Sequence, residues 1–195
     1  GGEFYGSTEG QFTVGSPSLW QERPGTVGPA RPGRRLAVDA DGTIWCAVPD
    51  HARFEYWRDP AKTAAAWRHD AFTVGDLGRL DDDGCLFLDG RRDDLIISGG
   101  VNVYPAEVEQ VLGSVAGVGE VAVFGAPDER WGQRVCAAVV PDGPVEPDSV
   151  ITHARAHLAA YKCPKEVYVV DDLPRTATGK VRRSAIAVHL GLDGE

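Results

Sequence analysis

The chain has 195 residues, of which 43% are hydrophobic and 25% are charged, a composition typical of a globular protein with one large or two small cores. Its formal net charge of -9 and its pI near 5.0 argue against binding to nucleic acid or to an anionic membrane, because a polyanion would be repelled. No apolar run approaches the ~20 residues that a membrane-spanning helix requires, and the chain opens without a charged and then apolar leader. These features predict a soluble, cytoplasmic protein with no membrane span.

The cysteines and the first residue add two further expectations. The four cysteines (Cys46, Cys85, Cys136 and Cys163) lack CxxC spacing, so they predict neither a zinc site nor a disulfide framework and fit a reducing compartment. The chain opens with Gly1 and contains no methionine at all. We therefore expect it to begin inside a longer chain.

Turn signals break the stretch from Val27 to Leu88 into short apolar runs. Residues 38–45 (VDADGTIW) and 80–87 (LDDDGCLF) each place an Asp-Gly turn between apolar residues, which predicts two β-hairpins. Neither acidic cluster has the ligand spacing of an EF-hand loop, which disfavours calcium. Residues 59–67 (DPAKTAAAW) combine an N-cap, a first-turn proline and good helix formers, and they predict a short surface helix.

Strands and helices alternate in the second half of the chain. Apolar residues spaced at i, i+3, i+4 and i+7 predict a helix that begins at Pro105, and the residues of this face are Val108, Val111, Leu112 and Val115. Valine-rich runs predict strands at 120–124, 135–140 and 166–170, and a second helical pattern covers 148–160. The second half therefore reads as a small α+β domain with its own core.

Two polar segments in the first half have the residue types of a nucleotide site. Residues 5–10 (YGSTEG) place two hydroxyls and a carboxylate between glycines, which suits a phosphate oxygen and Mg2+ held by Glu9, with a polar loop after a strand as the alternative. Residues 73–78 (TVGDLG) place Asp76 at the start of a hairpin. There its carboxylate can accept from both hydroxyls of a ribose, with an ordinary turn as the alternative.

Two later segments have features of ligand-binding loops. Residues 90–100 (GRRDDLIISGG) end in a glycine pair that either lets a narrow ligand pass close to the backbone or forms a tight hairpin. Residues 173–183 (LPRTATGKVRR) present Lys180 on a loop of small residues, where it can carry a flexible positive charge to an anionic ligand. A P-loop is excluded because Pro174 and Val181 replace its first glycine and its Ser or Thr.

These segments occur in the same order and with similar spacing as the later motifs of the adenylate-forming superfamily of acyl-CoA synthetases, luciferases and peptide-synthetase adenylation domains. The chain resembles the C-terminal part of an AMP-dependent fatty-acid or aromatic-acid CoA ligase of this superfamily. The resemblance extends over nearly the whole chain and is most specific at 75–91, at 99–109 and from 158–165 to 179–180.

The resemblance implies an α/β and α+β fold in three parts. Residues 1–89 would be the end of the large adenylating domain, truncated and rich in β-hairpins that form a β-barrel subdomain. Residues 90–94 would be a hinge, with the backbone rotation at Asp93. Residues 95–195 would be a small, mobile α+β domain that alternates between two orientations.

The resemblance also implies an activity: ATP-dependent activation of a carboxylic acid through an acyl adenylate, followed by transfer to CoA. The cofactors would be ATP, Mg2+ and CoA, and the setting fatty-acid metabolism in the cytoplasm. The partners would be the acid and the missing N-terminal portion of the same enzyme, with no nucleic acid; a homodimer is left open.

Five residues of the first part receive roles in adenylation from the resemblance. Tyr5 would lie against the adenine, Thr8 would contact the α-phosphate and Glu9 would bind Mg2+. Asp76 and Arg91 would hold the ribose hydroxyls.

The remaining roles fall in the second part. Lys180 would bridge the substrate carboxylate and the α-phosphate, where it would offset charge that builds in the transition state. Gly100 would line the pantetheine tunnel. Trp131 and Tyr161 match positions where some members pack an aromatic ring against the CoA nucleotide, and Lys165 would contact a CoA phosphate, although packing and a solvated lysine remain alternatives.

Two departures from the family pattern limit this reading. Val74 replaces the usual Thr or Ser before Gly-Asp. The upstream Ser/Thr/Gly-rich loop that clamps the β- and γ-phosphates is absent from the 195 residues, so we expect this chain alone to be inactive in adenylation. The alternatives are an inactive fragment or non-catalytic module, or an adenylating enzyme that loads a carrier protein.

Overall fold

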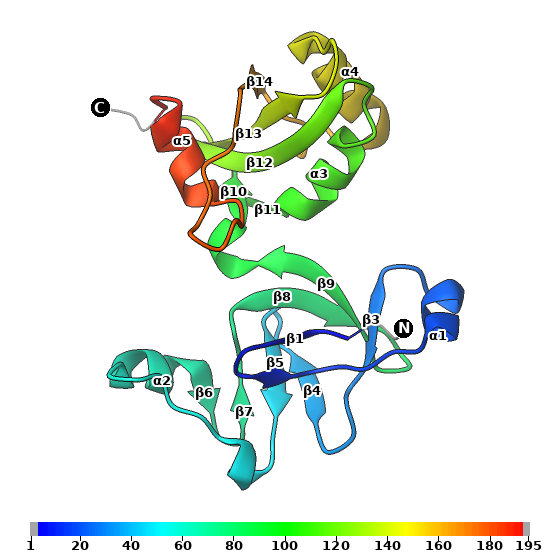
Figure 1. The fold of residues 1–195 in the computed structure, drawn as a ribbon, viewed down its shortest axis with the longest axis vertical. Helices are drawn as coiled ribbons and strands as arrows, with labels where there is room; N and C mark the ends of the chain where they lie inside the picture. Colours follow the sequence, from blue (N-terminus) through cyan, green and yellow to red (C-terminus); the bar gives the residue numbers. More distant parts are fainter. Residues whose placement is uncertain (1–3, 193–195) are drawn as a thin grey trace. The chain divides into compact units, whose positions relative to one another are not determined.

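A computed structural model describes residues 4–192 and divides the chain into two compact units, Gly1–Asp93 and Asp94–Glu195 (Figure 1). We refer to them as the N-unit and the C-unit. Within the described residues, no helix has the length and apolar character needed to cross a membrane.

The N-unit consists of antiparallel strands in a short ribbon and two sheets (Figure 1). The ribbon pairs β1 (Gly6–Ser7) with β2 (Gly10–Gln11). The three-stranded sheet has the order β3 (Thr26–Pro29), β9 (Cys85–Arg91), β8 (Asp76–Leu80). The four-stranded sheet has the order β4 (Arg35–Val38), β5 (Ile44–Ala47), β7 (Ala71–Phe72), β6 (Trp67–Arg68).

Both predicted hairpins are confirmed. The β4–β5 and β8–β9 pairs turn through Gly42 and Gly84, whose φ angles of 85° and 77° lie in the left-handed region that glycine adopts without steric cost. The predicted surface helix is also confirmed as α2 (Pro60–Ala66), with Asp59 accepting a 2.9 Å hydrogen bond from the backbone of Lys62. This unit also contains α1 (Pro17–Glu22) and a 3-10 turn at Asp50–Ala52, and a further 3-10 turn at Arg92–Asp94 spans the boundary between the units in sequence.

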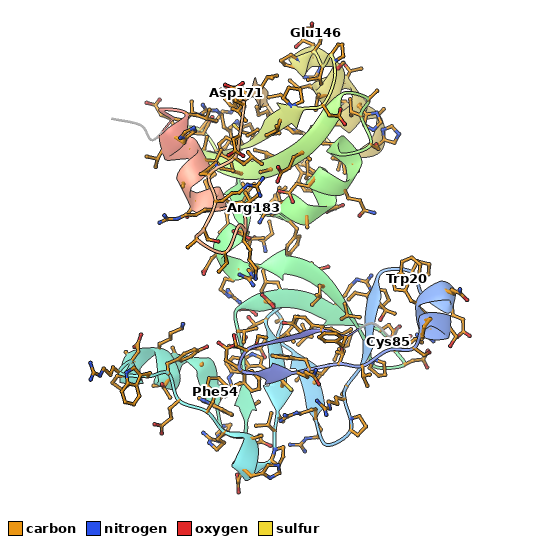
Figure 2. The ribbon with its side chains drawn as sticks, viewed as in Figure 1. Trp20, Phe54, Cys85, Glu146, Asp171 and Arg183 are labelled. Carbon is orange, nitrogen blue, oxygen red and sulfur yellow. The ribbon has the colours of Figure 1, made fainter. Side chains whose placement is uncertain are left out.

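An aromatic cluster fills the core of the N-unit. Phe12 and Phe72 are fully buried and meet edge to face at 5.0 Å between ring centroids. Phe54, labelled in Figure 2, packs edge to face on Phe72 at 5.0 Å and lies 5.1 Å from Trp67. Such pairs add to the area that the rings bury, and they join the ribbon, the four-stranded sheet and the loop before α2.

A five-stranded sheet forms the frame of the C-unit (Figure 1). Its strands are β10 (Ile96–Ser98), β11 (Val101–Val103), β12 (Val118–Asp128), β13 (Gly132–Pro141) and β14 (Glu166–Val169). The antiparallel order is β11-β10-β13-β12, and β14 pairs with β13 in parallel. The predicted strands are present, but β12 and β13 extend several residues beyond the valine-rich runs.

Alternate residues of β12 and β13 enter two different cores, because side chains along a strand point to opposite faces. Val123 and Val139 face the helices α3 (Pro105–Leu112) and α4 (Pro147–His157). Phe124 and Cys136 face Leu173 and α5 (Ile186–His189) on the other side. The predicted α+β fold is confirmed, with helices over both faces of one sheet (Figure 1).

Helix ends differ from the predicted ones by a few residues. The α3 helix ends at Leu112, so Val115 lies beyond it but still packs against the core. The α4 helix ends at His157, because Leu158 adopts an extended backbone with ψ of 154°.

All four cysteines are buried and free. Burial raises the pKa of Cys46 and of Cys136 to about 11, so both remain thiols at neutral pH.

We expect Leu112→Ala to destabilise the 195-residue chain by about 2 to 5 kcal/mol, because Leu112 is fully buried and truncation leaves a cavity between α3 and the sheet. Urea denaturation followed by circular dichroism measures the effect. The control is Val188→Ala on α5, where the side chain is 59% exposed and a change under about 0.5 kcal/mol is expected. Equal effects of the two substitutions would contradict the packing described here.

Candidate functional site

Three predicted residues of the N-unit meet around one carboxylate. Tyr5 Oη donates to Asp76 Oδ2 at 2.5 Å, and Arg91 Nε lies 3.5 Å from Asp76 Oδ1. Asp76 and Arg91 are paired across β8 and β9, which fixes their separation. Burial and the neighbouring Asp76 raise the pKa of Tyr5 far above its ordinary value, so the phenol stays a hydrogen-bond donor.

The second oxygen of Asp76 is buried and has no hydrogen-bond partner among the described residues. The nearby Arg91 provides charge but no hydrogen bond, and its side chain is 65% exposed. An unpaired buried acceptor is costly, so it marks a place where a donor from outside the chain gains free energy by binding. The group fits a ligand hydroxyl.

Glu9 and Thr8 lie in the turn of the β1–β2 ribbon, with Thr8 exposed. Tyr56 Oη donates to Glu9 Oε1 at 2.8 Å, a contact across 47 residues of sequence. Partial burial opposes ionisation of Glu9, but hydrogen bonds from Ser7 and Tyr56 outweigh it and lower the pKa of Glu9. The carboxylate is therefore charged and oriented at neutral pH.

Two glycines and an indole meet in the C-unit. Gly99 and Gly100 have φ angles of 60° and 79°, and the indole of Trp131 covers Gly99 so closely that a Cβ there would lie 2.7 Å from Cε3. The Gly99 amide donates to the Trp131 carbonyl at 2.8 Å. A Cβ on Gly100 would meet no atom within 4 Å. The predicted Gly100 and Trp131 thus lie together, with open space over Gly100.

The remaining residues predicted for CoA lie on the segment between α4 and β14. Tyr161 is 46% exposed. The neighbouring Lys162 forms ion pairs of 2.6 and 2.7 Å with Glu107 on α3, which holds this segment against the helix. Lys165 lines a shallow cavity of about 220 Å³ with Arg155 and four other residues.

Lys180 lies at the end of a small hairpin formed by residues 174–182. The backbone bridges Arg175 to Val181, and Thr176 N donates to the Lys180 carbonyl at 2.8 Å. Lys180 is exposed, and within residues 4–192 its ammonium group forms no ion pair. It remains a mobile charge on a fixed loop.

The predicted site residues therefore form separate groups. Tyr5, Asp76 and Arg91 form one group in the N-unit, with Glu9 in a second network. In the C-unit, Gly100 lies beside Trp131, whereas Tyr161, Lys165 and Lys180 lie on other segments.

The sequence did not predict two residues that hold or orient groups of the candidate site. Tyr56 orients Glu9, and Arg183 forms ion pairs with Glu109 and Asp94. Tyr56 lies outside the motifs and Arg183 is the last residue of the 173–183 segment, and both act on residues that are distant in sequence.

Comparison with known proteins places these groups in a family context. Residues 107–180 match the family model described as the AMP-binding enzyme C-terminal domain. The chain is 39% identical over 198 residues to indoleacetate--CoA ligase of Aromatoleum aromaticum. The alignment covers 94% of this chain and 39% of that protein.

Two solved structures also match nearly the whole chain. The o-succinylbenzoate CoA synthetase MenE of Bacillus subtilis, in complex with the acyl-adenylate intermediate OSB-AMP, matches with a TM-score of 0.88 at 35% identity over 94% of this chain and 40% of that one. The ATP-bound MatB of Rhodopseudomonas palustris matches with a TM-score of 0.83 at 36% identity over 96% of this chain and 40% of that one. The chain spans about two fifths of the length of the relatives it matches.

We expect Gly99→Ala to cost at least ~1 kcal/mol more free energy of unfolding than Gly100→Ala. Both substitutions place a Cβ at a positive φ, but only the one at Gly99 collides with an indole ring. Urea denaturation compares the two stabilities, and the indole N–H resonance of Trp131 should shift only in Gly99→Ala. Similar costs with no such shift would contradict the packing of Trp131 on Gly99.

We also expect Tyr56→Phe to raise the pKa of Glu9 toward its ordinary value, because the donor that favours the carboxylate is lost. The stability that this pair contributes is present above the ordinary glutamate pKa and is lost as the pH falls through the folded pKa. Titration of the Glu9 side-chain carboxyl by 13C NMR measures the change. Tyr104→Phe is the control, and an unchanged Glu9 titration in Tyr56→Phe would refute the contact.

Proposed function

We propose that this chain, which belongs to the adenylate-forming CoA ligases as their C-terminal part, serves in the ATP-dependent activation of a carboxylic acid and in transfer of the acyl group to CoA. The observation that carries the proposal is Asp76. One of its oxygens is held by Tyr5, and the other is buried next to Arg91 and accepts no hydrogen bond from any residue that the structure describes. Such a carboxylate suits a ribose hydroxyl, which is the role that the family pattern gives to this position.

In the adenylation step, the N-unit would hold the nucleotide. Asp76 would accept from a ribose hydroxyl, with Arg91 beside it, and Tyr5 would lie against the adenine. Thr8 is exposed in the ribbon turn and would donate its hydroxyl to the α-phosphate.

The residues present fit a magnesium ion. Glu9 is a charged carboxylate oriented by Tyr56, and Mg2+ is commonly held by one or two carboxylates together with substrate phosphates. Among residues 4–192, no three His, Cys, Asp or Glu side chains gather to bind a metal by themselves. Glu9 would thus hold Mg2+ jointly with ATP, and the ion would neutralise phosphate charge.

Lys180 would supply the second positive charge. Its ammonium group is exposed on a hairpin whose two strands pair at Arg175 and Val181. This group would bridge the acid carboxylate and the α-phosphate as negative charge builds between them. Rotation of the C-unit about Asp93 would then remove Lys180 and present the face that carries Gly100.

In the thioester step, the C-unit would bind CoA. The open space over Gly100 would admit the narrow pantetheine arm, and the exposed ring of Trp131 next to it would pack on the nucleotide. Tyr161 would add a second aromatic surface, and Lys165 would contact a phosphate. Because the thiol would attack the acyl adenylate, the products would be the thioester and AMP.

The whole activity would require the longer enzyme of which this chain is a part. Most of the acyl pocket and the loop for the β- and γ-phosphates would lie in the remaining three fifths, since the chain spans about two fifths of its relatives. We place the enzyme in the cytoplasm, and four free buried cysteines support a reducing compartment.

In the longer enzyme, we expect Lys180→Ala to reduce adenylation by about 100-fold or more, because a charge that acts in the transition state is lost. Thioester formation from a supplied acyl adenylate should stay within about threefold, since Lys180 has no part in that step. ATP-pyrophosphate exchange measures the first half-reaction, and release of the acyl-CoA measures the second.

Arg182→Ala is the matched control, because it removes an exposed cation from the same hairpin. Equal damage to both half-reactions in Lys180→Ala would remove the assigned role. Acyl transfer to a phosphopantetheinyl carrier protein in preference to free CoA would redirect the proposal to a carrier-loading enzyme.

A further inference from the structure

Arg183, labelled in Figure 2, forms the most extensively bonded ion-pair network of the C-unit's described residues. Its Nη2 donates to both oxygens of Glu109 on α3, at 2.8 and 2.9 Å, and its Nε donates to the same carboxylate at 3.1 Å. Its Nη1 donates to Asp94 Oδ2 at 2.9 Å. One guanidinium thus ties three separate segments together through bidentate geometry that lysine cannot reproduce.

The network is shielded from water. The side chains of Arg183, Glu109 and Asp94 are only 24%, 16% and 26% exposed. Glu109 also accepts a 2.8 Å hydrogen bond from the backbone of Val123 on β12. The carboxylate is therefore fixed to the central sheet, and Arg183 is fixed through it.

The position of Arg183 in the chain connects this network to Lys180. Arg183 follows the second strand of the 174–182 hairpin, only three residues after Lys180. The backbone of Arg182 closes the base of that hairpin with a 2.7 Å hydrogen bond to the Pro174 carbonyl. Because Arg183 directly follows this base, its ion pairs fix the orientation of the hairpin.

Asp94 connects the same network to the boundary of the C-unit. On the N-unit side of Asp93, Arg92 donates to Asp41 at 2.9 Å and its amide donates to the Gly75 carbonyl at 2.8 Å. On the other side, Asp94 is held by Arg183. The side chain of Asp93, which lies in sequence between Arg92 and Asp94, forms no hydrogen bond or ion pair within the described part of the chain.

We propose that Arg183 is a positioning residue, which fixes both the Lys180 hairpin and the first residue after Asp93 to the body of the C-unit. The hairpin and Asp94 then move as one rigid body, and backbone rotation is confined to Asp93. This inference rests on the proposed function, because it assigns Arg183 to the delivery of Lys180 in adenylation.

The chain alone tests the geometric part of the proposal. In the 195-residue chain, Arg183→Gln should speed amide hydrogen exchange of residues 176–181 and of Leu95 by about tenfold or more, because both segments lose their anchor. Arg175→Gln, which breaks an exposed pair with Glu120 at 2.5 Å, should have a smaller effect on the same hairpin. Unchanged exchange in Arg183→Gln would overturn the anchoring role.

Kinetics of the longer enzyme test the functional part. Arg183→Gln should lower the kcat of adenylation by about 10- to 100-fold with little change in the KM for ATP, because displacement of a reacting group by about 1 Å costs on this order. Thioester formation from a supplied acyl adenylate should change by less than about threefold. A merely structural role would lower both half-reactions together and would overturn the proposal.

Arg183→Lys keeps the test decisive if the glutamine variant folds poorly. The lysine preserves the charge that compensates Glu109 and Asp94 but loses the bidentate geometry, so the loss in adenylation should persist at a smaller size. An Arg183→Lys variant with full adenylation would overturn the proposal. Lys180→Ala, measured in parallel, separates the two ideas, since normal adenylation in that variant would refute the proposed function itself.

Discussion

The C-unit depends on one constraint, the antiparallel pair of β12 and β13 with apolar side chains on both faces. Helices α3 and α4 cover one face, so the other face must be covered by the chain that follows β14. Leu173 and Ile186 provide that cover, and both are almost fully buried. The hairpin with Lys180 lies between these two attachment points in sequence, which places an exposed cation on a segment held at both ends. The turn between β12 and β13 carries Trp131. Burial of two faces thus positions the groups that act at the surface.

In the N-unit, a carboxylate plays the comparable part. Asp76 lies in a partly buried place, where Tyr5 donates to it and Arg91 lies opposite on the neighbouring strand. The sheet register fixes Arg91, and the core contact of Tyr5 with Phe12, at 4.9 Å between centroids, fixes the phenol. Within residues 4–192, the carboxylate therefore keeps one oxygen without a hydrogen-bond donor, which costs free energy of folding.

Local patterns were sufficient for much of the fold. Asp-Gly turns located both hairpins of the N-unit, an N-cap with a first-turn proline and good helix formers located α2, and periodic apolar residues located α3 and α4. The extent of β12 was less accessible, because Gly125 and Pro127 interrupt its apolar pattern and only pairing with β13 keeps them in the strand. The order of the motifs indicated the candidate site, but its supports depend on distant contacts. Tyr56 meets Glu9 across 47 residues, and Arg183 meets Glu109 across 74, distances over which a single sequence gives no signal.

Net charge and local charge have different consequences in this chain. The formal charge of -9 disfavours polyanions as partners, yet residues 175–183 carry four cations. Two of these, Arg175 and Arg183, are compensated by carboxylates of the sheet and of α3. Among the described residues, Lys180 and Arg182 have no such ion pairs, so the uncompensated charge lies along the second strand of the hairpin. Screening limits exposed charges to about 10 Å at moderate salt, so Lys180 acts only on an anion beside it. The compensated arginines determine where that charge lies, and the uncompensated lysine determines what it attracts.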